Sequence, residues 1–116
     1  MSPAILAAAA AAFNLTCPGI STVDSEGFPH TQFYRVDLDK GRWCSGNCDK
    51  TGAIYSIAAN RIILEHEKDS SHESTITLNR EDGSVLTRTT IAGVGTLEFK
   101  GVCERKPFTG FPALRF

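Results

Sequence analysis

Four cysteines carry the clearest chemistry in this 116-residue chain: Cys17, Cys44, Cys48 and Cys103. If all four are bridged, three pairings are possible. Cys44 and Cys48 are separated by Ser-Gly-Asn, a turn-forming spacer that can bring their Cα atoms into disulfide range. This spacing predicts a short-range disulfide between them.

Strand alternation predicts the partner of each remaining cysteine. Cys17 falls on the apolar face of the expected strand 13–17, and Cys103 falls on the apolar face of the expected strand 96–104. The first and last strands of a closed sheet could meet on that side. We therefore predict a Cys17–Cys103 disulfide, which stabilises by about 4–5 kcal/mol in the chain-entropy account.

Instead of forming disulfides, the four cysteines could bind a zinc ion or remain free thiols. Structural zinc sites usually use C-x2-C pairs, whereas this chain has one close pair, Cys44 and Cys48, with C-x3-C spacing. The spacing favours disulfides over metal, and disulfides are typical of exported proteins.

A second group with possible chemistry is His66, Asp69 and His72, in the polar segment 67–72 and beside it. Imidazole and carboxylate groups bind zinc, but the spacing is not H-E-x-x-H and no helix is expected there. Solvated loop charge is the alternative interpretation. A metal-dependent enzyme at this loop is the least favoured function, and no cofactor is expected.

Sequence motifs for catalysis are missing. The chain has no G-x-S-x-G, no P-loop and no dinucleotide-binding fingerprint. Asp24, Glu26, Asp37 and Asp39 supply carboxylates that nothing in the sequence pairs for acid–base work. We therefore expect a non-enzymatic binding module, holding a protein or a small apolar ligand.

Phe33, Arg35, Trp43 and Tyr55 form the candidate interaction surface. Aromatic residues and arginine are enriched at interface hot spots. Phe33 and Arg35 share the outward face of the expected strand 33–38, close in sequence to the only tryptophan. The alternative is that Trp43 belongs to the core, as lone tryptophans are usually mostly buried.

Composition limits the partners. The chain has 41% hydrophobic and 22% charged residues, typical of a globular protein, and its net charge is −1. No global positive field attracts nucleic acid or an anionic membrane surface. The small basic group Lys100, Arg105 and Lys106 is typical of a solvated face.

Residues 1–12 (MSPAILAAAAAA) stand apart from the rest. The apolar run 3–13 is too short to span a bilayer, and it ends in A-x-A like a secretory signal peptide, although no basic residue precedes it. The alternative is an N-terminal helix capped by Ser2, with Pro3 at its first position. We expect export to the periplasm or secretion, no membrane span, and a single β domain over 13–116.

The remaining chain alternates short strand patterns with turn signals. Strands are expected at 13–17, 33–38, 42–44, 53–58, 61–66, 74–79, 84–91 and 96–104. Pro18-Gly19 is expected to end the first strand and 20–31 to be a loop, while 59–60 and 81–83 are turns. The tail 106–116 is expected to lie extended, anchored by Phe108, Phe111 and Phe116.

This pattern predicts an all-β fold, an antiparallel meander of about eight short strands braced by disulfides. A small barrel or a strongly curved sheet is favoured, because closure removes exposed strand edges. A β-sandwich is the alternative.

Three segments carry a resemblance to known proteins: FYRVDLDKGRWC, ITLNREDGSV and GVCERKPFTGFP. They resemble small uncharacterised exported proteins of Gram-negative bacteria, over most of 13–112, which implies an exported bacterial protein. The chain is also similar to periplasmic inhibitors of C-type lysozyme, small β-barrels with a cysteine near each end, as Cys17 and Cys103 are here. The inhibitory loop of that family contains Ser-Gly and a tyrosine; residues 51–55, TGAIY, resemble it only in part, with Thr-Gly in place of Ser-Gly. This similarity implies inhibition of a lysozyme-like cell-wall hydrolase.

Overall fold

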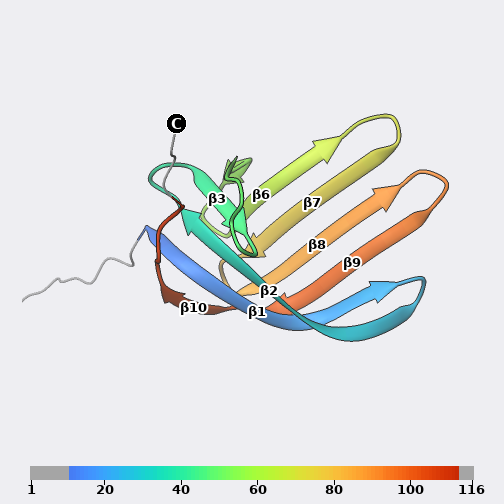
Figure 1. The fold of residues 1–116 in the computed structure, drawn as a ribbon, viewed down its shortest axis with the longest axis horizontal. Coiled ribbons are helices and arrows are strands. Elements are labelled where there is room, and N and C mark those ends of the chain that lie inside the picture. The colour runs from blue at the N-terminus through green and yellow to red at the C-terminus, as the bar shows by residue number, and fades with distance from the viewer. Residues whose placement is uncertain (1–10, 113–116) are drawn as a thin grey trace, which may run out of the picture.

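A computed structural model describes residues 11–112, which form one antiparallel sheet and contain no helix (Figure 1). Its ten strands are β1 (Ala12–Val23), β2 (Glu26–Asp37), β3 (Arg42–Ser45), β4 (Gly52–Ala53), β5 (Ser56–Ile57), β6 (Arg61–Lys68), β7 (His72–Asn79), β8 (Ser84–Ile91), β9 (Gly95–Val102) and β10 (Glu104–Pro107). In this part of the chain no helix has the length and apolar character needed to cross a membrane. The signal-peptide interpretation of 1–12 falls on residues outside the described range, apart from the last two.

The sheet curls into a half-barrel. Its strand order is β4-β3-β2-β1-β9-β8-β7-β6-β5, and β10 pairs with β1 in line with β9 (Figure 1). The prediction of an antiparallel, strongly curved, all-β fold is therefore confirmed. The closed barrel and the sandwich are not formed, because β4 and β5 remain the two edges of a single open sheet.

Both predicted disulfides are present. Cys17 is bridged to Cys103 and Cys44 to Cys48. Cys17 and Cys103 lie opposite one another in the register that pairs β1 with β9 and β10, with their Cα atoms 4.0 Å apart. The bridge therefore fastens the first strand to the last at the short break between β9 and β10.

The prediction of a loop at 20–31 was wrong. β1 continues through Pro18 and Gly19 to Val23, and β2 returns from Glu26 in unbroken register. Asp24 and Ser25 both have positive φ, 49° and 70°, the conformation that a type I′ hairpin turn requires. By strand alternation Pro18, which lacks an N–H, faces the break between β9 and β10, so no ladder hydrogen bond is lost.

The segment predicted as one strand at 53–58 is two short strands, β4 and β5, on opposite edges of the sheet. The two-residue loop at 59–60 is confirmed, since the N–H of Ala58 donates to the carbonyl of Arg61. The polar loop predicted at 67–72 is shorter, because β6 runs to Lys68 and β7 begins at His72.

The core occupies the end of the half-barrel where the short strands β3, β4 and β5 bring the two edges of the curled sheet toward each other. Strand alternation turns one face of each long strand inward, as expected for Cys17 and for Val36. The buried set is Phe13, Leu15, Cys17, Tyr34, Val36, Trp43, Ile62, Leu64, Ile76, Leu78, Val85 and Phe99.

Two glycines mark the end of this core. Gly19 of β1 and Gly101 of β9 are directly paired. A Cβ atom on Gly19 would lie 2.1 Å from the carbonyl oxygen of Lys100, and one on Gly101 would lie 2.6 Å from the carbonyl oxygen of Pro18. Only glycine permits this close approach of β1 and β9.

Candidate functional site

Beyond the glycine pair, three long hairpins extend past the core, and no other element of residues 11–112 covers their inner face. These hairpins are β1–β2, β6–β7 and β8–β9, and their tips lie at the same end of the half-barrel (Figure 1). We call the inner face of this end the trough. Its side chains include Ser21, Val23, Phe28, His30, Ile91, Leu97 and Phe99.

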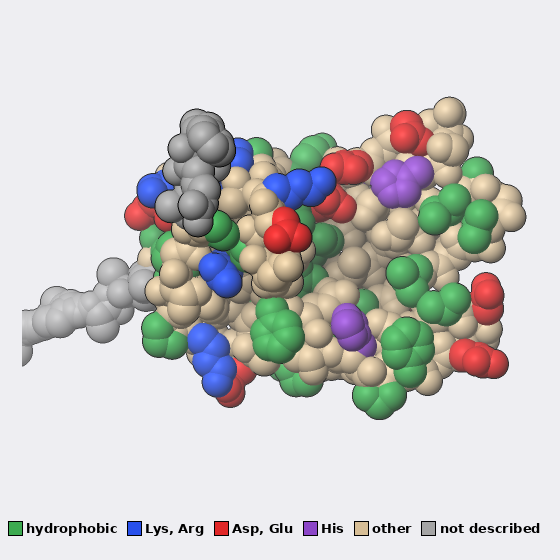
Figure 2. Space-filling view, viewed as in Figure 1, with side chains coloured by type: hydrophobic (Ala, Val, Ile, Leu, Met, Phe, Trp, Pro, Cys, Tyr) green, Lys and Arg blue, Asp and Glu red, His purple; other side chains and the backbone are tan. Residues whose placement is uncertain are grey.

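The trough carries an exposed apolar patch. Val23, Phe28, Ile91 and Leu97 are each 40–48% exposed. Val23 is paired with Leu97, and the other two are diagonal neighbours of this pair in the register. Hydrophobic side chains gather at this end of the molecule around a hollow between the β6–β7 and β1–β2 hairpins (Figure 2).

The outer face of the same hairpins is mostly polar. Thr90 and Thr96 share a hydrogen bond of 3.1 Å there, and Arg88 contacts Glu98 at 2.6 Å. A sheet end solvated on both faces should be polar on both, since alternation places each side chain on one face only. An apolar inner face that water reaches is the usual mark of a binding surface.

Polar groups line the inner end of the trough. The Tyr34 hydroxyl donates to the side-chain oxygen of Gln32 and lies 3.3 Å from the Thr87 hydroxyl. On the far side, the Ser74 hydroxyl donates to a Glu65 carboxylate oxygen at 2.8 Å. The trough therefore has an apolar outer part and hydrogen-bonding groups where it meets the core.

Burial raises the pKa of Tyr34, and the nearby Glu65 charge adds to this, while the hydrogen bond to Thr87 opposes it. A phenol whose pKa is raised in the folded state contributes stability that is complete below the unfolded value of about 10. This contribution is lost as the pH rises through the folded pKa.

We therefore predict that Tyr34→Phe flattens the alkaline fall in stability. At pH 8 the variant should lose about 1 kcal/mol through its missing hydrogen bonds. Urea denaturation between pH 8 and pH 11 measures both effects. Equal alkaline slopes in the variant and the wild type would contradict this account of Tyr34.

The loop that the Cys44–Cys48 disulfide closes lies beside the inner end of the trough. A groove of about 310 Å³ lies between Ser45-Gly46 of the loop and the inner-face residues His30, Tyr34 and Thr87. The backbone N–H of Gly46 donates to the carbonyl of Phe33, which ties the loop to β2. The Cys44–Cys48 bridge thus holds a wall of this groove in place.

The four residues of the predicted interaction surface do not form one patch. Phe33 is exposed on the outer face, where Arg35 donates from Nη1 to the carbonyl of Gly110 at 2.8 Å. Trp43 lies on the opposite, inner face, is 9% exposed and packs near Tyr34. The core alternative for Trp43 is therefore correct. Tyr55 is 59% exposed, beside His66.

The structure does not bring His66, Asp69 and His72 together. The register places His66 opposite Thr75 on the outer face and His72 opposite Ile91 on the inner face. The Asp69 carboxylate accepts hydrogen bonds from the N–H and hydroxyl of Ser71, which lower its pKa. In residues 11–112, no three such ligand side chains lie close enough to hold a metal ion.

Sequence reasoning missed the trough. Val23 and Phe28 fall in the segment interpreted as a loop, where Pro18, Gly19 and Pro29 disfavour a strand. The available signal was the two-residue spacing of Ser21 and Val23 and of Thr89 and Ile91, which places each couple on one face of a strand and is compatible with two long hairpins.

Comparisons of the chain with protein-family models, curated proteins and solved structures gave no match.

Proposed function

We propose that this protein is a non-enzymatic exported binding protein that holds a small apolar ligand in the trough. One observation carries the proposal: the patch of Val23, Phe28, Ile91 and Leu97 is apolar and exposed on the inner face of the curled sheet, while the opposite face of the same hairpins is mostly polar (Figure 2). Binding sites for small molecules combine an apolar lining with a few polar groups that fix orientation. Gln32, at the inner end, belongs to such a polar group.

Two further observations support this proposal. The Cys17–Cys103 disulfide joins strands of the sheet, and the Cys44–Cys48 disulfide closes the loop beside the trough. The binding surface is therefore held in place before a ligand binds. Two disulfides in a small domain also support export to an oxidising compartment such as the periplasm.

Titration with N-phenyl-1-naphthylamine, a neutral apolar fluorophore, tests the proposal. Phe28→Ser and Leu97→Ser should each weaken binding about tenfold, the equivalent of roughly 1.4 kcal/mol, because each removes an apolar contact. Ile20→Ser is the matched control, since Ile20 is also 48% exposed but lies on the outer face. Loss of binding in the control alone, or equal affinity in all four proteins, would refute the proposal.

Inhibition of a lysozyme-like cell-wall hydrolase is the second candidate. The observation in its favour is Tyr55, the tyrosine of the TGAIY segment, which is exposed and free to enter a partner's cleft. Micromolar protein should then inhibit C-type lysozyme, and Tyr55→Ala should reduce inhibition at least tenfold, as expected of an aromatic hot spot. Undiminished lysozyme activity at that concentration would remove this candidate.

A further inference from the structure

The inner face of the trough changes in character from one side to the other. One row of directly paired residues crosses it from β6 to β1: Glu67, Ser74, Thr89, Leu97 and Val23. The row begins with a carboxylate, continues through two hydroxyl groups and ends with two apolar side chains. The β6 side of the trough is therefore acidic and polar, while the β9 and β1 side is apolar.

A second carboxylate lies on the β6 side. Glu65 is paired with Ile76 on the inner face, is partly buried, and accepts the hydrogen bond from the Ser74 hydroxyl at 2.8 Å. Glu65 and Glu67 together line a groove of about 610 Å³ between β6 and the Cys44–Cys48 loop. Ser45 of this loop lines both this groove and the groove at the inner end of the trough. The two carboxylates are thus open to a ligand beside the trough.

Charged side chains of the three hairpins are divided between the two faces. By register, their lysines and arginines all lie on the outer face: Arg35, Arg61, Lys68, Arg88 and Lys100. The outer-face carboxylate of Glu98 is paired with Arg88 and Lys100. Within residues 11–112, Glu65 and Glu67 form no ion pair, although Lys50 lines the same groove. The inner face therefore carries carboxylates without a counter-charge from these residues.

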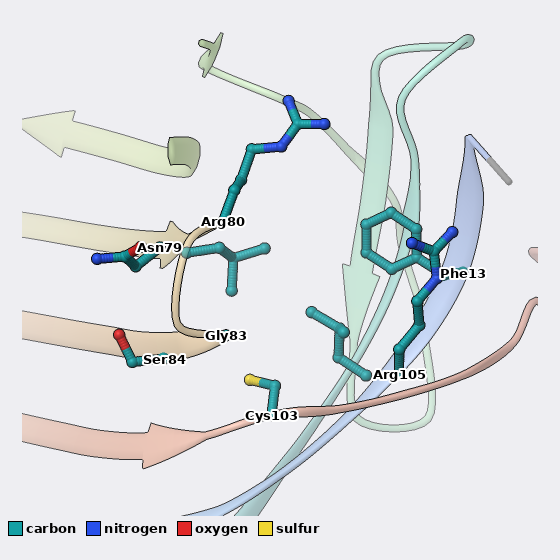
Figure 3. Close-up of a pocket in the computed structure, with 9 residues that line it drawn as sticks. Phe13, Asn79, Arg80, Gly83, Ser84, Cys103 and Arg105 are labelled. Atoms are coloured by element: carbon teal, nitrogen blue, oxygen red, sulfur yellow. The ribbon is translucent and has the colours of Figure 1, made fainter. Parts of the chain in front are cut away.

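Two further arginines lie at the other end of the half-barrel. Arg80 and Arg105 line a pocket of about 200 Å³ there (Figure 3). The guanidinium carbon of Arg105 lies 4.6 Å from the ring centroid of Phe13, a residue of the core. Because the core lies between this pocket and the trough, neither arginine belongs to the trough.

We infer that the ligand of the trough is a small amphiphile with one positive charge, its apolar part on the exposed patch and its ammonium group at Glu65 and Glu67. This inference rests on the proposed function. Glu67 on β6 and Leu97 on β9 are three strand spacings apart, about 14 Å along the sheet, a distance that a medium-length alkyl chain spans. An ammonium group can donate charge-assisted hydrogen bonds to both carboxylates, whereas an anionic headgroup would be repelled.

Displacement of N-phenyl-1-naphthylamine by octylammonium, octanol and octanoate tests the inference, because these competitors share one alkyl chain and differ in charge. The measurement is made at pH 8, where imidazole groups such as those of His30 and His72 are ordinarily neutral. Octylammonium should have an inhibition constant below about 1 mM, within the efficiency of small ligands. This constant should be about fivefold lower than that of octanol, as expected for a partly exposed ion pair, and octanoate should compete least.

Substitution of the carboxylates identifies the group that recognises the charge. Glu65→Gln and Glu67→Gln should each reduce the preference for octylammonium over octanol about threefold, since each removes one negative charge and keeps the side-chain shape. Glu73→Gln is the matched control, because Glu73 lies on the outer face of the neighbouring strand and is paired with His66. This variant should keep the preference of the wild type.

The contrary outcomes separate this inference from the proposed function. If N-phenyl-1-naphthylamine binds and Phe28→Ser weakens it, but octylammonium and octanol compete equally, the inference falls and the proposed function stands. A preference for octanoate, or an equal loss of preference in Glu73→Gln and the two inner-face variants, would also overturn the inference. If the neutral fluorophore does not bind at all, both fall together.

Discussion

Replacing Cys17 and Cys103 together with alanine should lower the free energy of unfolding by about 4–5 kcal/mol. Cys17 and Cys103 are 86 residues apart in sequence, so the bridge closes a long loop. Removing the bridge therefore returns a large conformational entropy to the unfolded chain and stabilises the unfolded state. It also joins β1 to the β9–β10 break, the one point where the ladder along β1 is interrupted. Urea denaturation under non-reducing conditions measures the loss.

The second disulfide provides the control. Cys44 and Cys48 are only 4 residues apart, so the pair of alanine substitutions should cost about 2 kcal/mol in the same account. Equal losses for the two double variants would show that loop entropy does not determine the contribution of the Cys17–Cys103 bridge. A larger loss at Cys44 and Cys48 would indicate that the short loop organises the core.

Gly101→Val should also be strongly destabilising, with an expected loss in the free energy of unfolding of about 3 kcal/mol or more. A side chain at this position would meet the carbonyl oxygen of Pro18 at 2.6 Å and the ring of Phe99 at 3.0 Å. Backbone cannot move aside as a flexible side chain can, so β1 and β9 would have to separate.

Gly46→Ala is the control for the conformational freedom of glycine alone. Gly46 has a φ of 62°, and no atom of residues 11–112 lies within 4 Å of the position that its Cβ would take, so alanine there should cost about 1 kcal/mol. Thermal and urea denaturation of both variants separates the two effects. If Gly101→Val cost no more than Gly46→Ala, the close approach of β1 and β9 would not be what the glycine pair provides.

Much of the fold follows from local patterns in the sequence. Alternation placed Cys17 and Cys103 on the apolar faces of the first and last strands, and with the short spacing of Cys44 and Cys48 this predicted the long-range bridge. The turn at 81–83 was predictable because Gly83 supplies the positive φ, 76°, that this position requires.

Other features depend on contacts that the sequence does not display. Asp24-Ser25 is an uncommon sequence for a type I′ turn, which prefers glycine at the second position. Pro18 is tolerated in β1 only because the opposing ladder breaks at Cys103. Alternation identifies Leu97 as inward-facing, but it cannot show whether another strand covers it. The trough exists because the short strands β4 and β5 close only one end of the sheet.

The most direct test of the trough is to map the bound apolar ligand by the methyl resonances of the protein. In a carbon–proton correlation spectrum, N-phenyl-1-naphthylamine should shift the methyl signals of Val23, Ile91 and Leu97. The methyl signals of Ile20 and Val102, which are exposed on the outer face, should remain in place. Shifts confined to Ile20 and Val102, or no shift at the trough when the ligand is bound, would contradict the assignment of the trough as the binding site.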